Sequence, residues 1–177
     1  GGGASASSAD GRYAIDALTG RITTRAALNF EGGSPSVAYT VIARDNAGAS
    51  PFNESQSAVT IGIADLNEAP VSLNWTPSLA SVAERDRIAA GTARPAISLG
   101  TLSVPDPDTA GLPSASYAFT VSDSRFEVVN GTLRLKQDAA FDFEAGASVT
   151  VTVTGRDQTG VPFTITRAIT IAVTDQD

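Results

Sequence analysis

The sequence contains no cysteine and no histidine among its 177 residues. Without cysteine no disulfide can stabilise the fold, and without histidine the chain also lacks the commonest general base in enzymes. Phosphate-binding glycine loops are missing as well, because the run Gly1 to Gly3 follows no predicted strand and opens no predicted helix. These absences argue against an enzyme.

Long apolar runs and basic residues are also scarce. No apolar run approaches the roughly 18 residues that span a bilayer, and the first residues do not resemble a signal peptide. We therefore expect an internal segment of a longer exported protein, located outside the cell or at its surface, with no direct membrane insertion in this segment. Lys and Arg number 12 against 19 Asp and Glu, a net charge of −7. This balance argues against nucleic acid as a partner and favours cations.

The residues that are present are typical of β-strands. Hydrophobic residues make up 42% of the chain and aromatic residues only 6%, while Val, Ile, Thr, Ala and Ser dominate, as in sheets with one solvated face. Val37 to Ala43 and Val149 to Thr154 alternate apolar and polar residues. Tyr13 to Asp16, followed by Thr19-Gly20, predicts a β-hairpin. The class is all-β.

Short motifs recur in the same order about 110 residues apart, which is the length of one β-sandwich domain. The pairs are Phe30-Glu31 with Phe143-Glu144, Arg44-Asp45 with Arg156-Asp157, and Ile63-Ala64-Asp65 with Val173-Thr174-Asp175. The chain thus contains a tandem repeat of a whole domain.

Between the two copies lies Asp65-Leu66-Asn67-Glu68-Ala69-Pro70. With this segment, the repeat resembles the cadherin repeat, in the version common in large bacterial surface proteins, over nearly the whole chain. The resemblance implies tandem cadherin-like β-sandwiches of the immunoglobulin-like Greek-key type. Residues 1–68 would be the C-terminal part of one repeat, with about two strands missing from a domain of ordinary size, and residues 69–177 a complete repeat.

Further strands are expected near 71–73, 81–83, 97–104 and 116–121, and the last strand of each copy at 59–64 and 169–174. Residues 1–11, rich in Gly, Ala and Ser, should be loose or only weakly paired. A sandwich that lacks strands exposes unpaired edges, so we expect association with a partner through the first copy.

The resemblance also implies a calcium site where the two copies join. Calcium takes six to eight oxygen ligands from carboxylates, amides and backbone carbonyls. The matching positions are Glu31, Asp65, Asn67, Glu68, the carbonyl of Ala69, Asp106, Asp108 and Asp157. Asn29 stands where the family has an acid, which weakens part of the site. Without metal the acidic side chains would repel one another, and Ca²⁺ would make a mobile linker rigid.

A second, half-built site is implied at the far end of the second copy. Its acids would be Glu84, Asp142, Glu144, Asp175 and Asp177.

The function that follows is a calcium-binding cadherin-like adhesion module of a large bacterial cell-surface or secreted protein, binding calcium and like chains. Two alternatives stay open: a calcium-dependent module for cell-surface polysaccharide, or a passive β-sandwich spacer. An exposed Trp75 or Tyr117 would favour sugar binding by stacking on a pyranose ring. For Trp75 we expect packing into the core or a groove instead.

Overall fold

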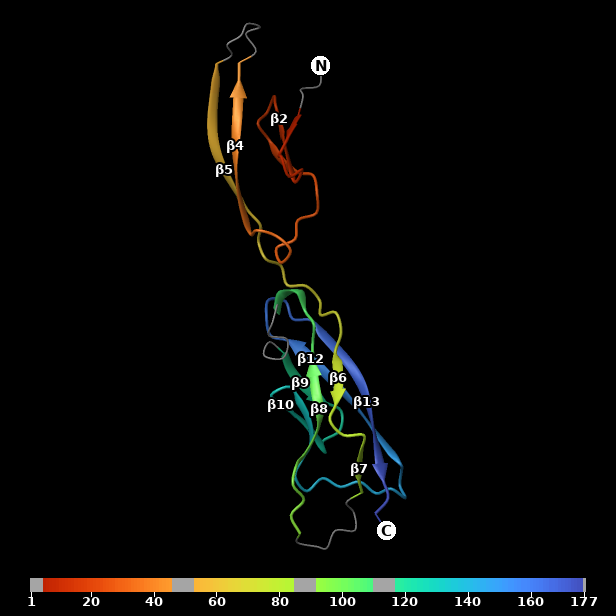
Figure 1. Ribbon diagram of the computed structural model, residues 1–177. Coiled ribbons are helices and arrows are strands. Elements are labelled where there is room, and N and C mark those ends of the chain that lie inside the picture. The colour runs from red at the N-terminus through yellow and green to blue at the C-terminus, as the bar shows by residue number, and fades with distance from the viewer. Residues whose placement is uncertain (1–4, 46–52, 85–91, 110–116, 177) are drawn as a thin grey trace. The chain divides into compact units, whose positions relative to one another are not determined.

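The computed structural model describes residues 5–45, 53–84, 92–109 and 117–176 (Figure 1). The chain divides into two compact units, residues 1–66 (unit 1) and 67–177 (unit 2). The described residues form β-strands and one short 3₁₀ turn, which confirms the predicted all-β class. Nowhere in this described part is there a helix with the length and apolar character that a membrane crossing requires.

Unit 2 is a sandwich of two four-stranded sheets. In spatial order, one sheet contains β10 (Phe126–Val129), β11 (Thr132–Leu135), β8 (Ile97–Ser103) and β6 (Asn74–Pro77). The other contains β7 (Ser81–Ala83), β13 (Thr164–Thr174), β12 (Ser148–Asp157) and β9 (Tyr117–Val121). β7 runs parallel to β13, while the other strand pairs are antiparallel.

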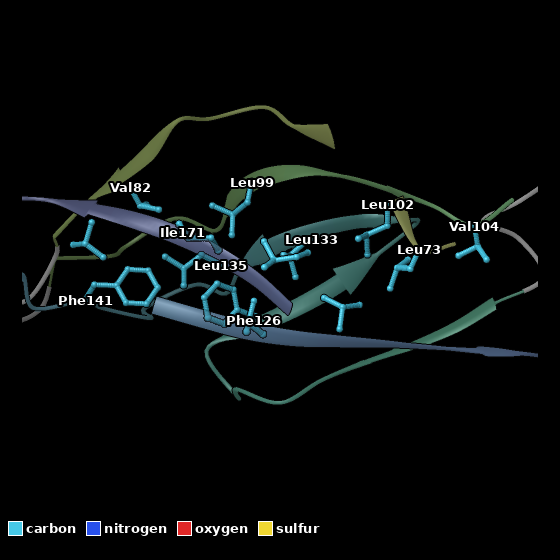
Figure 2. Close-up of a cluster of buried hydrophobic side chains, with 14 of the residues drawn as sticks. Leu73, Val82, Leu99, Leu102, Val104, Phe126, Leu133, Leu135, Phe141 and Ile171 are labelled. Atoms are coloured by element: carbon cyan, nitrogen blue, oxygen red, sulfur yellow. The ribbon is translucent and has the colours of Figure 1, made fainter. Parts of the chain in front are cut away.

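The core of unit 2 fills the space between these sheets (Figure 2). Along β12, Val151, Val153 and Asp157 turn inward and are 0% exposed, the result of the period-two alternation of a strand with one buried face. Each fully buried Val, Leu or Phe contributes about 1.5–3 kcal/mol. The buried apolar residues are Leu73, Val82, Leu99, Leu102, Val104, Tyr117, Phe126, Leu133, Leu135, Phe141, Val151, Val153, Ile169, Ile171 and Val173.

The start of unit 2 differs from the prediction. Residues 71–73 are not a strand, and pairing with β8 begins only at Asn74, which lies opposite Ser103. The reason is that β8 ends at Ser103, before Pro105, which has no N–H to extend the ladder. Val71 instead donates its N–H to the carbonyl of Pro105 at 2.9 Å and is 73% exposed.

Trp75 packs where β6 crosses Gly100 of β8. A Cβ atom at Gly100 would lie 2.4 Å from the carbonyl oxygen of Thr76 and 2.6 Å from Cη2 of Trp75, so only glycine lets the two strands approach. The indole packs on the core and also lines a small groove of about 180 Å³ with Leu79. The predicted core or groove packing of Trp75 is confirmed.

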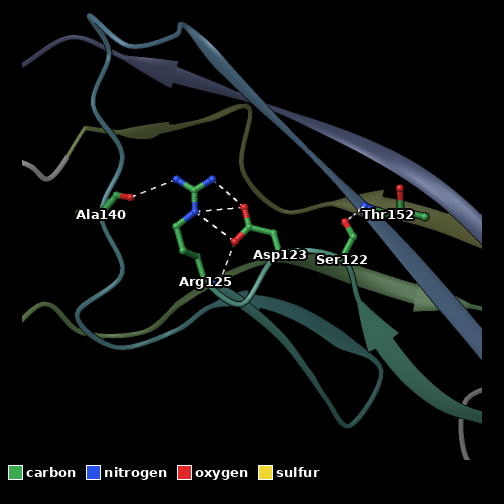
Figure 3. A network of polar contacts seen from close by, with 5 residues as sticks. All are labelled: Ser122, Asp123, Arg125, Ala140 and Thr152. Carbon is green, nitrogen blue, oxygen red and sulfur yellow. Dashed lines mark hydrogen bonds and ion pairs between the residues drawn. The ribbon is translucent and has the colours of Figure 1, made fainter.

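A polar network closes the turn between β9 and β10 (Figure 3). The guanidinium of Arg125 donates from Nε and Nη2 to the carboxylate of Asp123, at 3.1 Å and 2.6 Å. These bonds lower the pKa of Asp123 and raise that of Arg125. The same guanidinium lies 4.7 Å from the ring centre of Phe141, which ties the turn to the core.

Unit 1 contains two separate sheets. β1 (Ser5–Ser7), β2 (Tyr13–Asp16) and β3 (Ile22–Thr24) form one, and β4 (Ser36–Arg44) pairs with β5 (Glu54–Gly62) in the other. The β2–β3 hairpin confirms the prediction. β1 was not predicted as a strand, and it pairs with β2 over three positions only. β5 begins at Glu54, earlier than the predicted 59–64, and ends earlier as well.

The interior of unit 1 is sparse. Among its described residues, Tyr13 is the one buried hydrophobic side chain, packed edge-on against Tyr39 with ring centres 5.5 Å apart. An open groove of about 470 Å³ lies between the two sheets, lined by Ile15, Ile22 and Val41 among others. Unit 1 has strands but only a small core.

Asp10 and Tyr39 form a polar contact in unit 1. The hydroxyls of Ser8 and Tyr39 donate to the Asp10 carboxylate at 2.6 Å and 2.7 Å. These bonds lower the pKa of Asp10 to about 2. Burial, together with the bond to Asp10, raises the pKa of Tyr39 to about 12.

Candidate metal centre

One end of unit 2 gathers acidic side chains from three places in the sequence. Asp106 follows β8, Asp108 lies in the 3₁₀ turn η1 (Pro107–Thr109), and Asp157 is the last residue of β12. The first two are half-buried, and Asp157 is 0% exposed. The segments that carry them follow β8 in one sheet and end β12 in the other, at the same end of the sandwich.

Asp106 is held on both oxygens. The N–H of Asp108 donates to its Oδ1 at 3.0 Å, a turn that the rigid ring of Pro107 favours. Its Oδ2 accepts a hydrogen bond from the hydroxyl of Tyr117. The carboxylate therefore has a fixed orientation.

Asp157 is a buried carboxylate that accepts several hydrogen bonds. Its Oδ1 accepts the N–H of Thr159 at 2.9 Å and the Thr159 hydroxyl at 2.8 Å. Burial on its own would raise the pKa of Asp157, but the bonds from Thr159 and from the side chain of Asn67 outweigh it, and the net pKa is lowered. Asp157 is therefore an anion at neutral pH, buried inside the protein.

The first residues of unit 2 are bound to the same loops. The Asn67 side chain donates from Nδ2 to the carbonyl of Val161 at 2.9 Å and accepts from the Thr159 hydroxyl at 2.8 Å. The N–H of Glu68 donates to Oδ2 of Asp108 at 2.8 Å. Asn67 and Glu68 thus lie against the loops that hold Asp157 and Asp108.

Oδ1 of Asp108 and Oδ2 of Asp157 are buried carboxylate oxygens without a hydrogen-bond donor in the described part of the chain. A buried charged oxygen without a partner costs several kcal/mol. Asp108 and Glu68 also offer carboxylate oxygens within 4.8 Å of each other. The donor set is entirely oxygen, with carboxylates and an amide from several loops, which fits a hard cation such as Ca²⁺.

The remaining predicted ligands are more exposed. Glu31 and Asp65 belong to unit 1, where both are exposed and each offers a carboxylate oxygen within 4.8 Å of the other. Ala69, predicted to contribute its carbonyl, is exposed in unit 2. Unit 2 therefore brings together Asn67, Glu68, Asp106, Asp108 and Asp157, and unit 1 brings together Glu31 and Asp65.

A second acidic cluster lies elsewhere in unit 2, as the sequence predicted. Glu84, Glu144 and Asp175 offer oxygens within 4.8 Å of one another. Glu84 is 4% exposed and accepts the backbone N–H of Phe143 at 3.1 Å and of Gln176 at 2.8 Å. Asp142 accepts the N–H of Ala145 within its own turn, and Asp177 lies outside the described residues.

Sequence reasoning missed Thr159 of the first site and misread Tyr117. Thr159, which links Asn67 to Asp157, was not predicted, although a hydroxyl two residues after an Asp is a common turn signal. Tyr117 was considered only as an exposed sugar platform. It is 6% exposed, with its hydroxyl on Asp106. Burial of the ring excludes that role for Tyr117.

No known family model matches the chain, and no curated protein matches it by sequence. Its structure is similar to EC1–4 of PcdhgB3, with a TM-score of 0.70 and 24% identity over 93% of this chain and 37% of that one. It is also similar to Drosophila N-cadherin EC1–4, with a TM-score of 0.69 and 18% identity over 97% and 40% of the chains. A protocadherin gammaB7 EC3–6 cis-dimer structure is similar with a TM-score of 0.66 and 22% identity, over 98% of this chain and 40% of that one.

This chain therefore spans well under half the length of each of these proteins. Its fold is that of cadherin extracellular repeats, which are Greek-key β-sandwiches, as the sequence resemblance predicted.

Proposed function

We propose that this chain is a calcium-binding cadherin-like adhesion module of a large bacterial cell-surface or secreted protein. The observation that carries the proposal is Asp157, a fully buried anion whose Oδ2 has no hydrogen-bond donor among the described residues. A bound divalent cation would supply the missing partner. Asp108 presents a second such oxygen from the neighbouring turn.

The proposed ligands come from both sides of the linker. Asn67, Glu68, Asp106, Asp108 and Asp157 would bind from unit 2. Asp65 precedes Glu68 by three residues, so the Cα atoms of the two residues lie within about 11 Å of each other in any conformation. Asp65, Glu31 and the carbonyl of Ala69 would complete the six to eight oxygen ligands that calcium takes.

Calcium would act on the linker through charge. Without metal, six carboxylates around the linker repel one another, and this repulsion favours separation of the loops that carry them. A bound Ca²⁺ would neutralise part of that charge and crosslink the linker to the loops after β8 and β12. A chain of such modules would then keep a fixed orientation between repeats, which an adhesive surface needs.

The adhesive partner we propose is a second copy of the module or of a related repeat. Support comes from the fold neighbours, one of which is a protocadherin cis-dimer structure. Sedimentation velocity of the intact chain at increasing concentration, with Ca²⁺ or with a chelator, tests this. Calcium-dependent dimers would support adhesion, whereas a monomer under both conditions would favour the passive-spacer alternative. In a separate experiment, binding to polysaccharide arrays would favour the sugar-binding alternative.

The calcium site itself is tested by titration calorimetry with thermal unfolding in parallel. We expect saturable binding with a Kd of order 10⁻⁴ to 10⁻³ M, as in other extracellular modules. At a Ca²⁺ concentration about 100 times the Kd, unit 2 should gain about 2.7 kcal/mol of stability and a higher Tm.

The variant Asp106→Ala with Asp108→Ala should lose both effects. A matched control, Glu54→Ala with Glu127→Ala, removes the same charge from surface ion pairs with Arg44 and Arg134 and should bind as the unaltered chain does. Absence of saturable binding up to about 10 mM, well above the expected range, would contradict the proposal.

A further inference from the structure

We propose that Tyr117 is a positioning residue of the metal centre, whose hydroxyl fixes the carboxylate of Asp106 in the orientation that binds the cation. This inference rests on the proposed function. Asp106 is one of the proposed ligands, and its carboxylate accepts hydrogen bonds from the Tyr117 hydroxyl and from the N–H of Asp108. Tyr117 itself would not bind the metal.

The register of the sheet sets the position of Tyr117. It is the first residue of β9, and its Cα lies directly opposite that of Asp157 in β12. Its hydroxyl reaches Oδ2 of Asp106. Tyr117 therefore connects the β12 ligand with the ligand that follows β8, through one rigid side chain that is 6% exposed.

The phenol hydroxyl of Tyr117 donates a hydrogen bond to the Asp106 carboxylate without adding a negative charge to the acidic site.

Gly155 provides the space for this arrangement. It lies opposite Phe119 in the β9–β12 register. A Cβ atom there would come within 3.1 Å of Cε1 of Phe119 and 3.4 Å of Cδ1 of Tyr117, whose rings pack together with centres 6.3 Å apart. Ala43 stands at the matching position of the first copy.

The first copy offers a natural comparison. At the offset that matches Tyr13 with Phe126, Ala4 and Ala6 stand where Tyr117 and Phe119 stand in the second copy, and β1 pairs with β2 instead of β4. Gly155 and the rings of Tyr117 and Phe119 thus occur together in the second copy, which also contains the buried carboxylates. Packing alone would not require a phenol hydroxyl at this position.

A pre-oriented carboxylate loses less rotamer freedom when it binds a metal. Removing one hydrogen bond that holds it should weaken Ca²⁺ binding roughly three- to tenfold, the range of a single net hydrogen bond. The test is Tyr117→Phe, which keeps the ring and deletes the hydroxyl. Calcium affinity would be measured by calorimetry on the intact chain.

Tyr39→Phe is the matched control, because the Tyr39 hydroxyl also donates to an aspartate, Oδ2 of Asp10 at 2.7 Å in unit 1. It should leave the calcium affinity unchanged. Calcium binding to Tyr117→Phe with the original affinity would overturn the positioning role while leaving the proposed function intact. If the unaltered chain binds no Ca²⁺, the proposed function itself fails.

A double-mutant cycle separates positioning from general packing. If Tyr117 acts through Asp106, then Tyr117→Phe should weaken binding in the unaltered chain but add nothing to Asp106→Asn. Equal losses in both backgrounds would indicate a merely structural effect and contradict the proposal. Thermal unfolding without Ca²⁺ establishes that each variant is folded.

Terbium gives a readout that does not depend on a variant folding. Tb³⁺ is a hard cation that occupies oxygen sites, and its emission is sensitised by an aromatic ring only at short range. The unaltered chain should show tyrosine-sensitised Tb³⁺ emission that excess Ca²⁺ displaces, because the ring of Tyr117 lies beside Asp106. Saturable Tb³⁺ binding without any tyrosine-sensitised emission would overturn the proposal.

Discussion

The two units contain the same central hairpin in two different surroundings. β4 and β5 pair from Ser36 with Gly62 to Arg44 with Glu54, and β12 and β13 pair over an equally long register from Ser148 with Ala172. In unit 2 the hairpin is flanked by β7 and β9 and has a buried face. In unit 1 no flanking strand is found among the described residues, and no residue of β4 is buried.

This difference shows that an alternating β-pattern specifies the pairing of two strands but not whether one face of the pair becomes buried. The alternating sequences of the two copies fold into nearly the same hairpin, but burial depends on strands contributed from elsewhere in the sequence. We propose that unit 2 corresponds to a complete repeat and unit 1 to the C-terminal part of one. The first copy then serves as an internal control for the second.

The largest predicted contrast concerns one aromatic position in each copy. Phe126 opens β10 and is 0% exposed, and Tyr13 opens the matching β2 at 6%. Phe126→Ala should cost about 3–5 kcal/mol of unfolding free energy, because it leaves a cavity in a packed core. Tyr13→Ala should cost about 1–2 kcal/mol, because few buried neighbours surround it.

Urea unfolding measures both losses. The fluorescence of Trp75, the single tryptophan, reports on unit 2, and circular dichroism reports on the whole chain. Equal losses for the two variants would show that unit 1 has as complete a core as unit 2, and the contrast drawn above would be wrong.

Hydrogen exchange sharpens the same contrast strand by strand. Amides in the β12–β13 ladder lie between flanking strands and should exchange only through global unfolding of unit 2. Amides of β4 and β5 have an open edge in the described structure and should exchange orders of magnitude faster. Protection of β4 that rises with protein concentration would instead indicate that a second chain covers the edge.

The smallest predicted effect is the loss of folding stability at acid pH. The bonds from Ser8 and Tyr39 depress the pKa of Asp10 to about 2, and those from Arg125 lower the pKa of Asp123. A carboxylate with a depressed pKa stabilises the fold fully above its unfolded value of about 3.9, and the contribution is lost as pH falls through the folded value. Both units should therefore weaken below about pH 4.

Asn substitutions test the sign of this effect. Urea midpoints measured from pH 6 to pH 2 should fall less steeply for Asp10→Asn in unit 1 and for Asp123→Asn in unit 2. At neutral pH, Asp123→Asn should cost about 1 kcal/mol or less, since its partner Arg125 is partly exposed. A steeper fall in either variant would contradict the assignment of these carboxylates.

Much of the fold was predictable because alternation and turn residues act locally. The hairpin over Tyr13 to Thr24 and the strands around Val151 and Ile171 follow from period-two patterns and turn glycines. Residues 71–73 were wrongly predicted as a strand, because their apolar pattern is local while their partner strand β8 ends before reaching them. Strand ends depend on the neighbour as much as on the strand's own residues.

The candidate acidic site was predictable in its charged residues and not in its supporting groups. Asp106, Asp108 and Asp157 were identified by motif, since acids in family order are visible in sequence. Thr159 and the hydroxyl of Tyr117 act through register and loop shape, which place residues far apart in sequence within hydrogen-bond distance.

The parallel pairing of β7 with β13 has a mechanical consequence. Ser81 lies opposite Ala172 and Ala83 opposite Thr174, so an early strand of unit 2 and its last strand run side by side in the same direction (Figure 1). Tension applied along the chain pulls these strands past each other, which loads their hydrogen bonds together instead of one after another. A module of this kind resists stretching in shear.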